Sequence, residues 1–194
     1  MIKKHLSEDI PEFLYNHDTN EPFSHCKMCG FPLEDKEAYA IEKVFKQNKK
    51  LGIREIVYEY AICMDCAGGV QDEISEESMQ SLKALYDEFG LQMFMKLEYL
   101  HSTEKYNIES WTEKCSFTGK DLNTCSEFSV SAIVEGGKLV YEHAPIAVSD
   151  DFMELMQERL SKKTRDYFDG FKDEFFDLPP ELKDLINGPT VGII

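Results

Sequence analysis

Hydrophobic and polar positions divide the first half of the chain into segments with two different periods. Runs rich in Ile, Val, Tyr and Phe predict strands at Ala38–Phe45 and Ile53–Ile62, joined by a polar turn. Apolar residues at helical spacing follow in residues 79–89 and again in residues 91–100. We expect Gly90 to end the first of these helices. The pattern therefore predicts a β-hairpin followed by two helical segments.

The same order of elements recurs in the second half. Strands are predicted near residues 127–134 and 138–143, with a Gly-Gly turn between them. Ser149 is a suitable N-cap for a helix whose apolar positions run from residue 152 to residue 168. A further short helix is predicted at residues 180–186.

These patterns give four segments. We expect a polar N-terminal arm at residues 1–22, a first module at 23–100, a linker at 101–112, and a second module with a helical tail at 113–194. The only tryptophan of the chain, Trp111, is expected to pack under the second knuckle, the turn that begins at Cys115. The fold class expected is α+β, with two tandem modules.

Composition and charge narrow the functional classes. A hydrophobic content of 42% and an aromatic content of 12% are typical of a chain with a packed core. The 37 acidic residues against 21 basic ones give a net charge of −16, which disfavours binding to nucleic acid. No apolar run reaches the roughly 20 residues of a membrane span, and no secretion signal is visible, so we expect a cytoplasmic protein without a membrane contact.

Two Cys-x-x-Cys pairs provide the clearest chemistry. They contribute Cys26, Cys29, Cys63 and Cys66, and a tetrahedral zinc ion prefers four such sulfur ligands. In a reducing cytoplasm these pairs favour a metal site over disulfides. We predict one structural zinc ion per chain, with iron as the alternative metal. Four protein sulfurs leave no open position for water, so catalysis at the metal is disfavoured.

The turn from Cys26 to Gly30, which we call the knuckle, is followed by a β-hairpin and then by the second cysteine pair at a helix start. This order resembles that of treble-clef zinc fingers. The resemblance covers about residues 24–90, and in a degraded form about residues 113–168. It implies that the knuckle supplies two zinc ligands and the helix start supplies two more. A zinc-ribbon arrangement, with the second pair on another hairpin, is the alternative, and Gly68 and Gly69 after the second pair weaken the expectation of a helix there.

The second module lacks the full ligand set. Matching the two halves places Cys115 at Cys26 and Thr118 at Cys29, and places Ile146 and Ser149 at the second pair. Because these side chains bind zinc poorly, we expect a metal-free module. A site rescued by Cys115, Cys125 and His143 stays open, as does a reactive thiol at Cys115 or Cys125.

The expected function is that of a non-catalytic zinc protein that serves as an interaction or scaffold module for an unidentified protein partner. One alternative is a nucleic-acid-associated regulator that uses the locally basic hairpin between Lys43 and Arg54. A second alternative is an enzyme with a pocket between the modules. His25 beside the first knuckle is a candidate neighbour or ligand of the metal, although surface exposure is the favoured expectation.

Overall fold

A computed structural model describes residues 6–175 of the 194-residue chain as an α+β fold. The predicted helix at residues 180–186 lies outside the described residues. The strands are β1 (Ser7–Asp9), β2 (Ala38–Asn48), β3 (Ile53–Cys63), β4 (Glu127–Glu135), β5 (Lys138–Val140) and β6 (Ile146–Ser149). The helices are α1 (Met64–Asp72), α2 (Glu76–Ser102), α3 (Ile108–Thr112), α4 (Asp150–Glu158) and α5 (Lys162–Phe175), and short 3-10 turns lie at Glu12–Leu14, Leu33–Asp35 and Leu122–Thr124.

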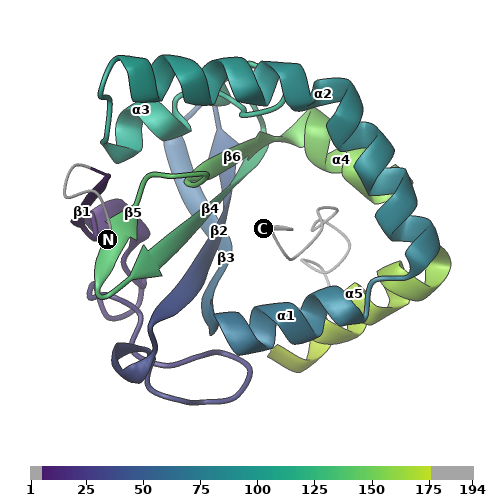
Figure 1. The fold of residues 1–194 in the computed structure, drawn as a ribbon, viewed down its shortest axis with the longest axis horizontal. Helices are drawn as coiled ribbons and strands as arrows, with labels where there is room; N and C mark the ends of the chain where they lie inside the picture. Colours follow the sequence, from purple (N-terminus) through teal and green to yellow (C-terminus); the bar gives the residue numbers. More distant parts are fainter. Residues whose placement is uncertain (1–5, 176–194) are drawn as a thin grey trace.

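The six strands form one antiparallel sheet that joins the two halves of the chain. Its order is β1-β5-β4-β2-β3, and β6 also pairs with β4 (Figure 1). The long strands β2 and β4 pair along their lengths, with Ile41 opposite Ala132 and Phe45 opposite Phe128. Strand β4 pairs with β5 at one end and with β6 at the other. The first hairpin therefore shares its core with the second half of the chain.

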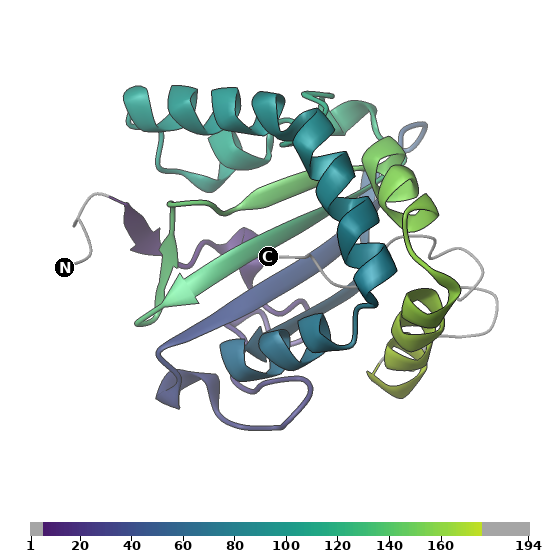
Figure 2. The ribbon, with the colours of Figure 1, turned by 45° about the vertical axis from the view of Figure 1, so that its right-hand side comes forward.

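The two faces of the sheet are covered by different parts of the chain. Helices α1, α2, α4 and α5 lie on one side of the sheet, and α5 contacts it through Phe171, whose ring centroid is 6.0 Å from that of Tyr60 (Figures 1 and 2). The N-terminal arm packs on the opposite face, where the rings of Phe13 and Phe45 stack with centroids 5.2 Å apart. Apolar side chains from both halves thus form the core.

Helix α2 differs from the expectation at Gly90. It continues through this residue as one helix of 27 residues instead of ending there. Ser75 caps its start, because its side chain accepts a hydrogen bond from the Ser78 N–H. A glycine in a helix interior costs only about 0.5–1 kcal/mol, which the packing of Leu82, Leu85 and Leu100 outweighs. Among the described residues, no helix is long and apolar enough to span a membrane.

The predicted strand at 138–143 is also corrected. Only its first three residues form a strand, β5, because the chain leaves the ladder after Val140, and a separate strand that was not predicted, β6, begins beyond Pro145. Proline has no N–H to donate to a ladder, which explains an interruption at this point. The segment expected as a linker contains the end of α2 and all of α3, and Trp111 of α3 is fully buried as expected.

The basic hairpin expected from the sequence is not a continuous positive surface. Lys43 is buried, and its ammonium pairs with Glu59 at 2.9 Å. The same ammonium donates hydrogen bonds to the carbonyl oxygens of Phe13 and Tyr15 in the N-terminal arm, at 3.1 and 2.6 Å. Lys43, which the nucleic-acid alternative would place on a binding surface, therefore ties the arm to the sheet.

Candidate metal centre

The first cysteine pair lies on a tight turn that precedes the sheet. The Gly30 N–H donates to the Cys26 carbonyl oxygen at 2.9 Å, and the Cys26 N–H donates to Phe31 at 2.8 Å. Gly30 has a φ of 70°, in the left-handed region that glycine adopts without strain. This turn places the side chains of Cys26 and Cys29 on the same side.

The second pair lies where β3 ends and α1 begins. Cys63 is both the last residue of β3 and the N-cap residue of α1, and Cys66 lies in the first turn of that helix. Gly68 and Gly69 do not prevent the helix, so the zinc-ribbon alternative, which needs a hairpin here, is wrong. The knuckle is attached to β3 because the Lys27 N–H donates to the Ala61 carbonyl oxygen at 2.8 Å.

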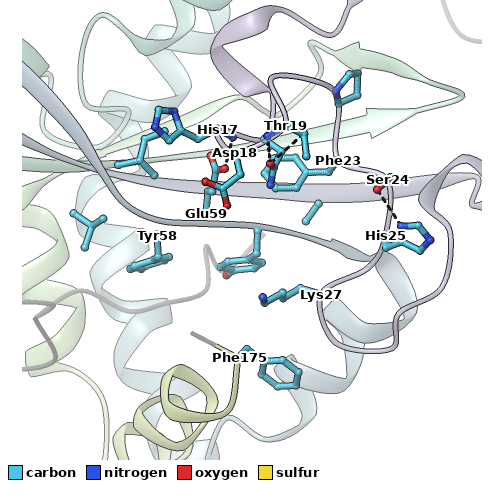
Figure 3. Close-up of a pocket in the computed structure, with 16 residues that line it drawn as sticks. His17, Asp18, Thr19, Phe23, Ser24, His25, Lys27, Tyr58, Glu59 and Phe175 are labelled. Atoms are coloured by element: carbon cyan, nitrogen blue, oxygen red, sulfur yellow. Dashed lines mark hydrogen bonds between the residues drawn. The ribbon is translucent and has the colours of Figure 1, made fainter. Parts of the chain in front are cut away.

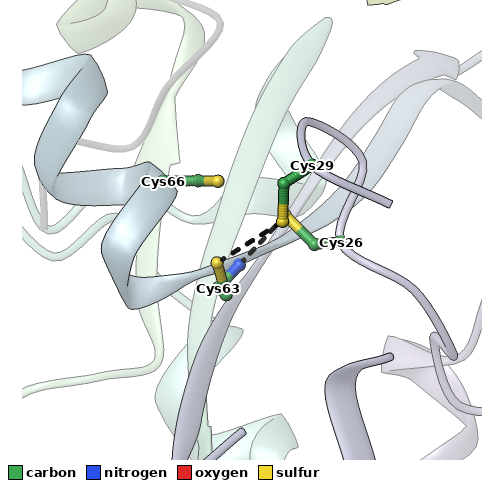
Figure 4. A group of neighbouring side chains, drawn as sticks. All are labelled: Cys26, Cys29, Cys63 and Cys66. Atoms are coloured by element: carbon green, nitrogen blue, oxygen red, sulfur yellow. Dashed lines mark hydrogen bonds between the residues drawn. The ribbon is translucent and has the colours of Figure 1, made fainter. Parts of the chain in front are cut away.

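These elements bring the four predicted cysteines together. All four Sγ atoms lie within 4.8 Å of one another, and those of Cys29 and Cys63 are 4.0 Å apart (Figure 4). Four sulfurs at 2.3 Å from a tetrahedral ion would be about 3.8 Å apart, so the cluster needs only a small contraction to hold one. Among residues 6–175, this is the only group of three or more His, Cys, Asp or Glu side chains arranged to hold a metal ion.

Burial and charge both favour a cation at the cluster. Cys26 and Cys63 are only 2% and 1% exposed, Cys66 is half-buried and Cys29 is exposed. Two thiolates 4.8 Å apart repel each other by about 3.5 kcal/mol at an effective dielectric constant of about 20. Six such pairs give a repulsion of about 20 kcal/mol, so four thiolates coexist here only around a positive ion.

The pKa shifts of the cysteines agree with the repulsion expected between neighbouring thiolates. Burial raises the pKa of Cys63, and burial together with the neighbouring cysteines raises that of Cys66. Burial alone would also raise the pKa of Cys26, but hydrogen bonds from the backbone of Cys29, Cys63 and Met28 lower it to about 7. Cys26 is therefore the thiol of this cluster that the fold itself prepares for ionisation.

An ion pair spans the two sides of the cluster. Lys36, which follows the knuckle, pairs with Asp65 in the first turn of α1 at 2.8 Å. The Lys36 ammonium also lies 4.8 Å from the ring centroid of Phe31. Because both groups are solvent-accessible, we assign the pair a positioning role with little stability of its own.

Comparison with protein-family models, with curated proteins and with solved structures finds no match to this chain.

A second turn in the chain has the hydrogen bonds of the first. The Gly119 N–H donates to Cys115 at 3.0 Å, and the Cys115 N–H donates to Lys120 at 2.8 Å. The Ser116 N–H donates to the Ala147 carbonyl oxygen at 2.7 Å, in the manner of Lys27 and Ala61. Ala147 thus corresponds to Ala61.

This correspondence corrects the alignment expected from sequence. If Ala147 matches Ala61, Cys63 corresponds to Ser149 and Cys66 to Phe152, not to Ile146 and Ser149. Ser149 is the N-cap residue of α4, as Cys63 is of α1. The Thr118 and Ser149 hydroxyl oxygens lie 3.2 Å apart, at the positions that Cys29 and Cys63 occupy in the first turn.

An aromatic stack fills the space beside these hydroxyl groups. The rings of Phe117 and Phe152 are parallel, with centroids 4.4 Å apart, and Phe89 of α2 contacts Phe152 edge-on at 5.2 Å. Phe152 is fully buried. Apolar packing therefore holds the second turn to its helix, where sulfur atoms gather in the first.

The rescued metal site at Cys115, Cys125 and His143 does not form among the described residues. Cys115 and Cys125 are fully buried, whereas His143 is exposed on the loop between β5 and β6. Burial is the first cause of a raised pKa of about 11 at Cys125, with the Asp150 carboxylate adding to it, which disfavours a reactive thiolate.

The histidines among residues 6–175 lie outside the cysteine cluster. His25 is exposed, as favoured from the sequence, and its Nδ1 lies 3.0 Å from the Ser24 hydroxyl. His101 is half-buried, with its ring centroid 5.6 Å from that of Trp111.

A cavity of about 460 Å³ lies beside the knuckle. Its wall combines residues 16–19 and 22–25 of the N-terminal arm, Lys27, the strand residues 56–61 and Phe175 of α5. Figure 3 shows His17 and Glu59 on one side of β3 and Tyr58 and Lys27 on the other, so the cavity surrounds the outer edge of the strand. Sequence reasoning missed this cavity, because its walls come from three separate parts of the chain.

Sequence reasoning also missed a half-buried lysine on α2, Lys96. Lys96 donates to the carbonyl oxygens of Trp111 and Lys114 at 2.6 and 2.8 Å, and to the Ser116 hydroxyl at 3.1 Å. Burial lowers its pKa to about 8, although Cys115 and Glu113 act in the opposite direction. All three N–H groups of its ammonium are occupied, so Lys96 ties α2 to the second turn.

Proposed function

We propose that this protein is a non-catalytic zinc-binding protein in which Cys26, Cys29, Cys63 and Cys66 hold one structural zinc ion. The observation that carries the proposal is the approach of four Sγ atoms to within 4.8 Å of one another. Zinc bound by four sulfurs has no free coordination position for a substrate. A tetrahedral all-sulfur site suits both zinc and iron, and we favour zinc because it has no redox chemistry and a structural site requires none.

The site acts as a staple between three pieces of the chain. The knuckle belongs to the N-terminal loop, Cys63 ends β3, and Cys66 belongs to α1. Helix α1 is short, at nine residues, and buries only Val70 among its apolar side chains. A bond from the metal to Cys66 in the first turn of α1 would attach the helix to the rest of the fold, which its limited apolar packing does not do.

We further propose that the two halves are copies of one treble-clef-like unit. Each half contains a glycine-closed turn, a 3-10 turn, strands and then helices in the same order, although the second half has three strands, β4, β5 and β6, where the first has β2 and β3. Strands β2 and β4, which correspond in this scheme, pair antiparallel at the centre of the sheet. The second copy has replaced its metal with the Thr118–Ser149 hydroxyl contact and the Phe152 stack.

The biological role we propose is a protein interaction or scaffold module in the cytoplasm. It is supported by an exposed row of large apolar side chains on α2. The net charge of −16 and the burial of Lys43 give no support to the nucleic-acid alternative. The hollow between α2 and residues 105–119 contains Lys96, whose donors are all occupied, so it gives no support to a catalytic lysine there.

Metal analysis of the purified protein tests the zinc proposal. We expect one equivalent of zinc per chain, which is released when the thiols are titrated with a mercurial reagent. Protein that contains no metal, or that contains zinc after all four cysteines have been replaced by serine, would contradict the assignment.

A further inference from the structure

The outer face of α2 carries a row of large apolar side chains. Leu91, Phe94, Met95 and Tyr99 are 70%, 60%, 58% and 54% exposed. We call these four residues the α2 stripe. In Figures 1 and 2, α2 runs along the periphery of the molecule, and no other described element lies over its outer side. Single exposed apolar residues are ordinary, but a contiguous row is characteristic of a binding surface.

The spacing of the α2 stripe makes it continuous. Relative to Leu91, the other three residues stand at positions i+3, i+4 and i+8, so each lies about one turn from a neighbour. Together they cover an arc of about 140° and a length of about 12 Å. At roughly 200 Å² for a fully exposed side chain of this size, they expose about 500 Å². This is the size of surface that an amphipathic helix covers with its apolar side chains.

Acidic residues lie beside the stripe, one before Leu91 and one between Met95 and Tyr99. Glu88 precedes Leu91 by three positions, and Glu98 follows Phe94 by four and Met95 by three. Both carboxylates are exposed. An occupant of the stripe must therefore place its flanking side chains next to negative charge.

We propose that the α2 stripe binds an amphipathic helical segment of a partner protein, with basic residues flanking its apolar positions. This inference rests on the proposed role as an interaction module. The apolar positions of the partner cover Leu91, Phe94 and Met95, and its Lys or Arg residues face Glu88 and Glu98.

Charge and area disfavour a second copy of this chain as the occupant. Parallel pairing of two stripes places Glu88 on Glu88 and Glu98 on Glu98, and antiparallel pairing places Glu88 within about one turn of Glu98. Each copy also carries a net charge of −16. A stripe of about 500 Å² falls short of the roughly 800 Å² per partner that a stable interface buries. An anionic membrane surface is disfavoured by the same acidic residues.

A hollow of about 450 Å³ extends the surface beside Met95 and Tyr99. Its other walls include Lys105, Lys114 and Glu113. Because both signs of charge line it, the preference for a basic segment comes from Glu88 and Glu98. The hollow gives room for one large side chain of the partner next to the stripe.

Two synthetic 18-residue peptides test the charge and the site together. Both carry the same leucines at i, i+3, i+4 and i+7, one with lysines and the other with glutamates at the flanking positions. Binding to the zinc-loaded full chain is followed by fluorescence anisotropy. We expect the lysine peptide to bind at least tenfold more tightly than the glutamate peptide, and Leu91→Ser/Phe94→Ser to weaken its binding at least tenfold.

A matched pair of charge variants separates local from global attraction. Glu88→Gln/Glu98→Gln and Glu154→Gln/Glu158→Gln change the net charge equally, but the second pair lies on the exposed side of α4. We expect several-fold weaker binding of the lysine peptide only for the first. Equal weakening by both, equal binding of the two peptides, or binding that survives Leu91→Ser/Phe94→Ser overturns the proposal.

Photo-crosslinking identifies the natural occupant. A photoreactive p-benzoylphenylalanine at position 94 is activated in extract of the cells that make the protein, and the crosslinked peptide is sequenced. A basic, amphipathic segment of another protein supports the proposal; an acidic segment, a second copy of this chain, a lipid or no crosslink overturns it. Metal content is measured in each sample, because loss of zinc would refute the metal assignment independently of binding at α2.

Discussion

Replacing Cys63 with serine is the most informative single perturbation of this fold. Cys63 is 1% exposed and stands where β3 passes into α1, so it contributes to a strand end, a helix cap and the metal cluster. A neutral serine hydroxyl is a poor zinc ligand, and it leaves three sulfurs. We expect the zinc content to fall from one equivalent to near zero.

The loss of zinc sets the size of the effect. A metal present at 1,000 times its dissociation constant stabilises the folded state by about 4 kcal/mol, and this stabilisation disappears with the site. Because β2 is also paired with β4, we expect the sheet to survive while α1 and the knuckle open. Hydrogen exchange should therefore accelerate in residues 26–30 and 64–72, with little change in β4.

Cys125→Ser provides the matched control, because Cys125 is equally buried but lies outside the metal cluster. The control variant should keep one equivalent of zinc and lose about 1–3 kcal/mol through burial of a hydroxyl group. The measurements are metal content by mass spectrometry and urea unfolding followed by the fluorescence of the buried Trp111. Full zinc occupancy in Cys63→Ser, or loss of zinc in Cys125→Ser, would refute the reasoning.

Three further predictions concern the second turn, an ion pair and helix α2. The triple variant Thr118→Cys/Ser149→Cys/Phe152→Cys places four cysteines, with Cys115, at the corresponding positions, and should bind two zinc ions per chain; a metal count that stays at one contradicts the duplication. Burial opposes ionisation of Asp150, but Lys120 at 2.6 Å and the N–H and hydroxyl of Ser126 hold the pKa of its carboxyl well below its usual range. Asp150→Asn should therefore cost about 1–2 kcal/mol at pH 7, allowing for partial screening, and this difference should shrink in unfolding experiments as the pH falls below about 4, the pKa of Asp in the unfolded chain. Gly90→Ala, where an added Cβ meets nothing within 4 Å, should stabilise the fold by about 0.5–1 kcal/mol in thermal unfolding, whereas Gly52→Ala, at a φ of +65°, should destabilise it.

The sequence by itself determined the local features of the fold. Residues of high β-propensity predicted the first hairpin, and the Cys-x-x-Cys spacing predicted which four side chains gather. Both are short-range properties, since a knuckle or a hairpin is specified by residues within one turn of each other. The same local reasoning failed at Gly90, where the packing of residues on either side outweighs one unfavourable helix position.

Only the tertiary structure decided how the two halves relate. The pairing of β2 with β4 joins residues about 90 positions apart, and no local pattern specifies such a contact. The same holds for the proposed correspondence of Cys63 with Ser149. It rests on the hydrogen bonds of Lys27 to Ala61 and of Ser116 to Ala147, which join residues more than 30 positions apart. Burial of Lys43 likewise depends on the N-terminal arm that packs over it. One of the positive charges counted in the hairpin sequence is therefore not exposed at the surface. Long-range packing decides which side chains solvent and partners can reach, and this is why the metal ligands were predictable and the α2 stripe was not.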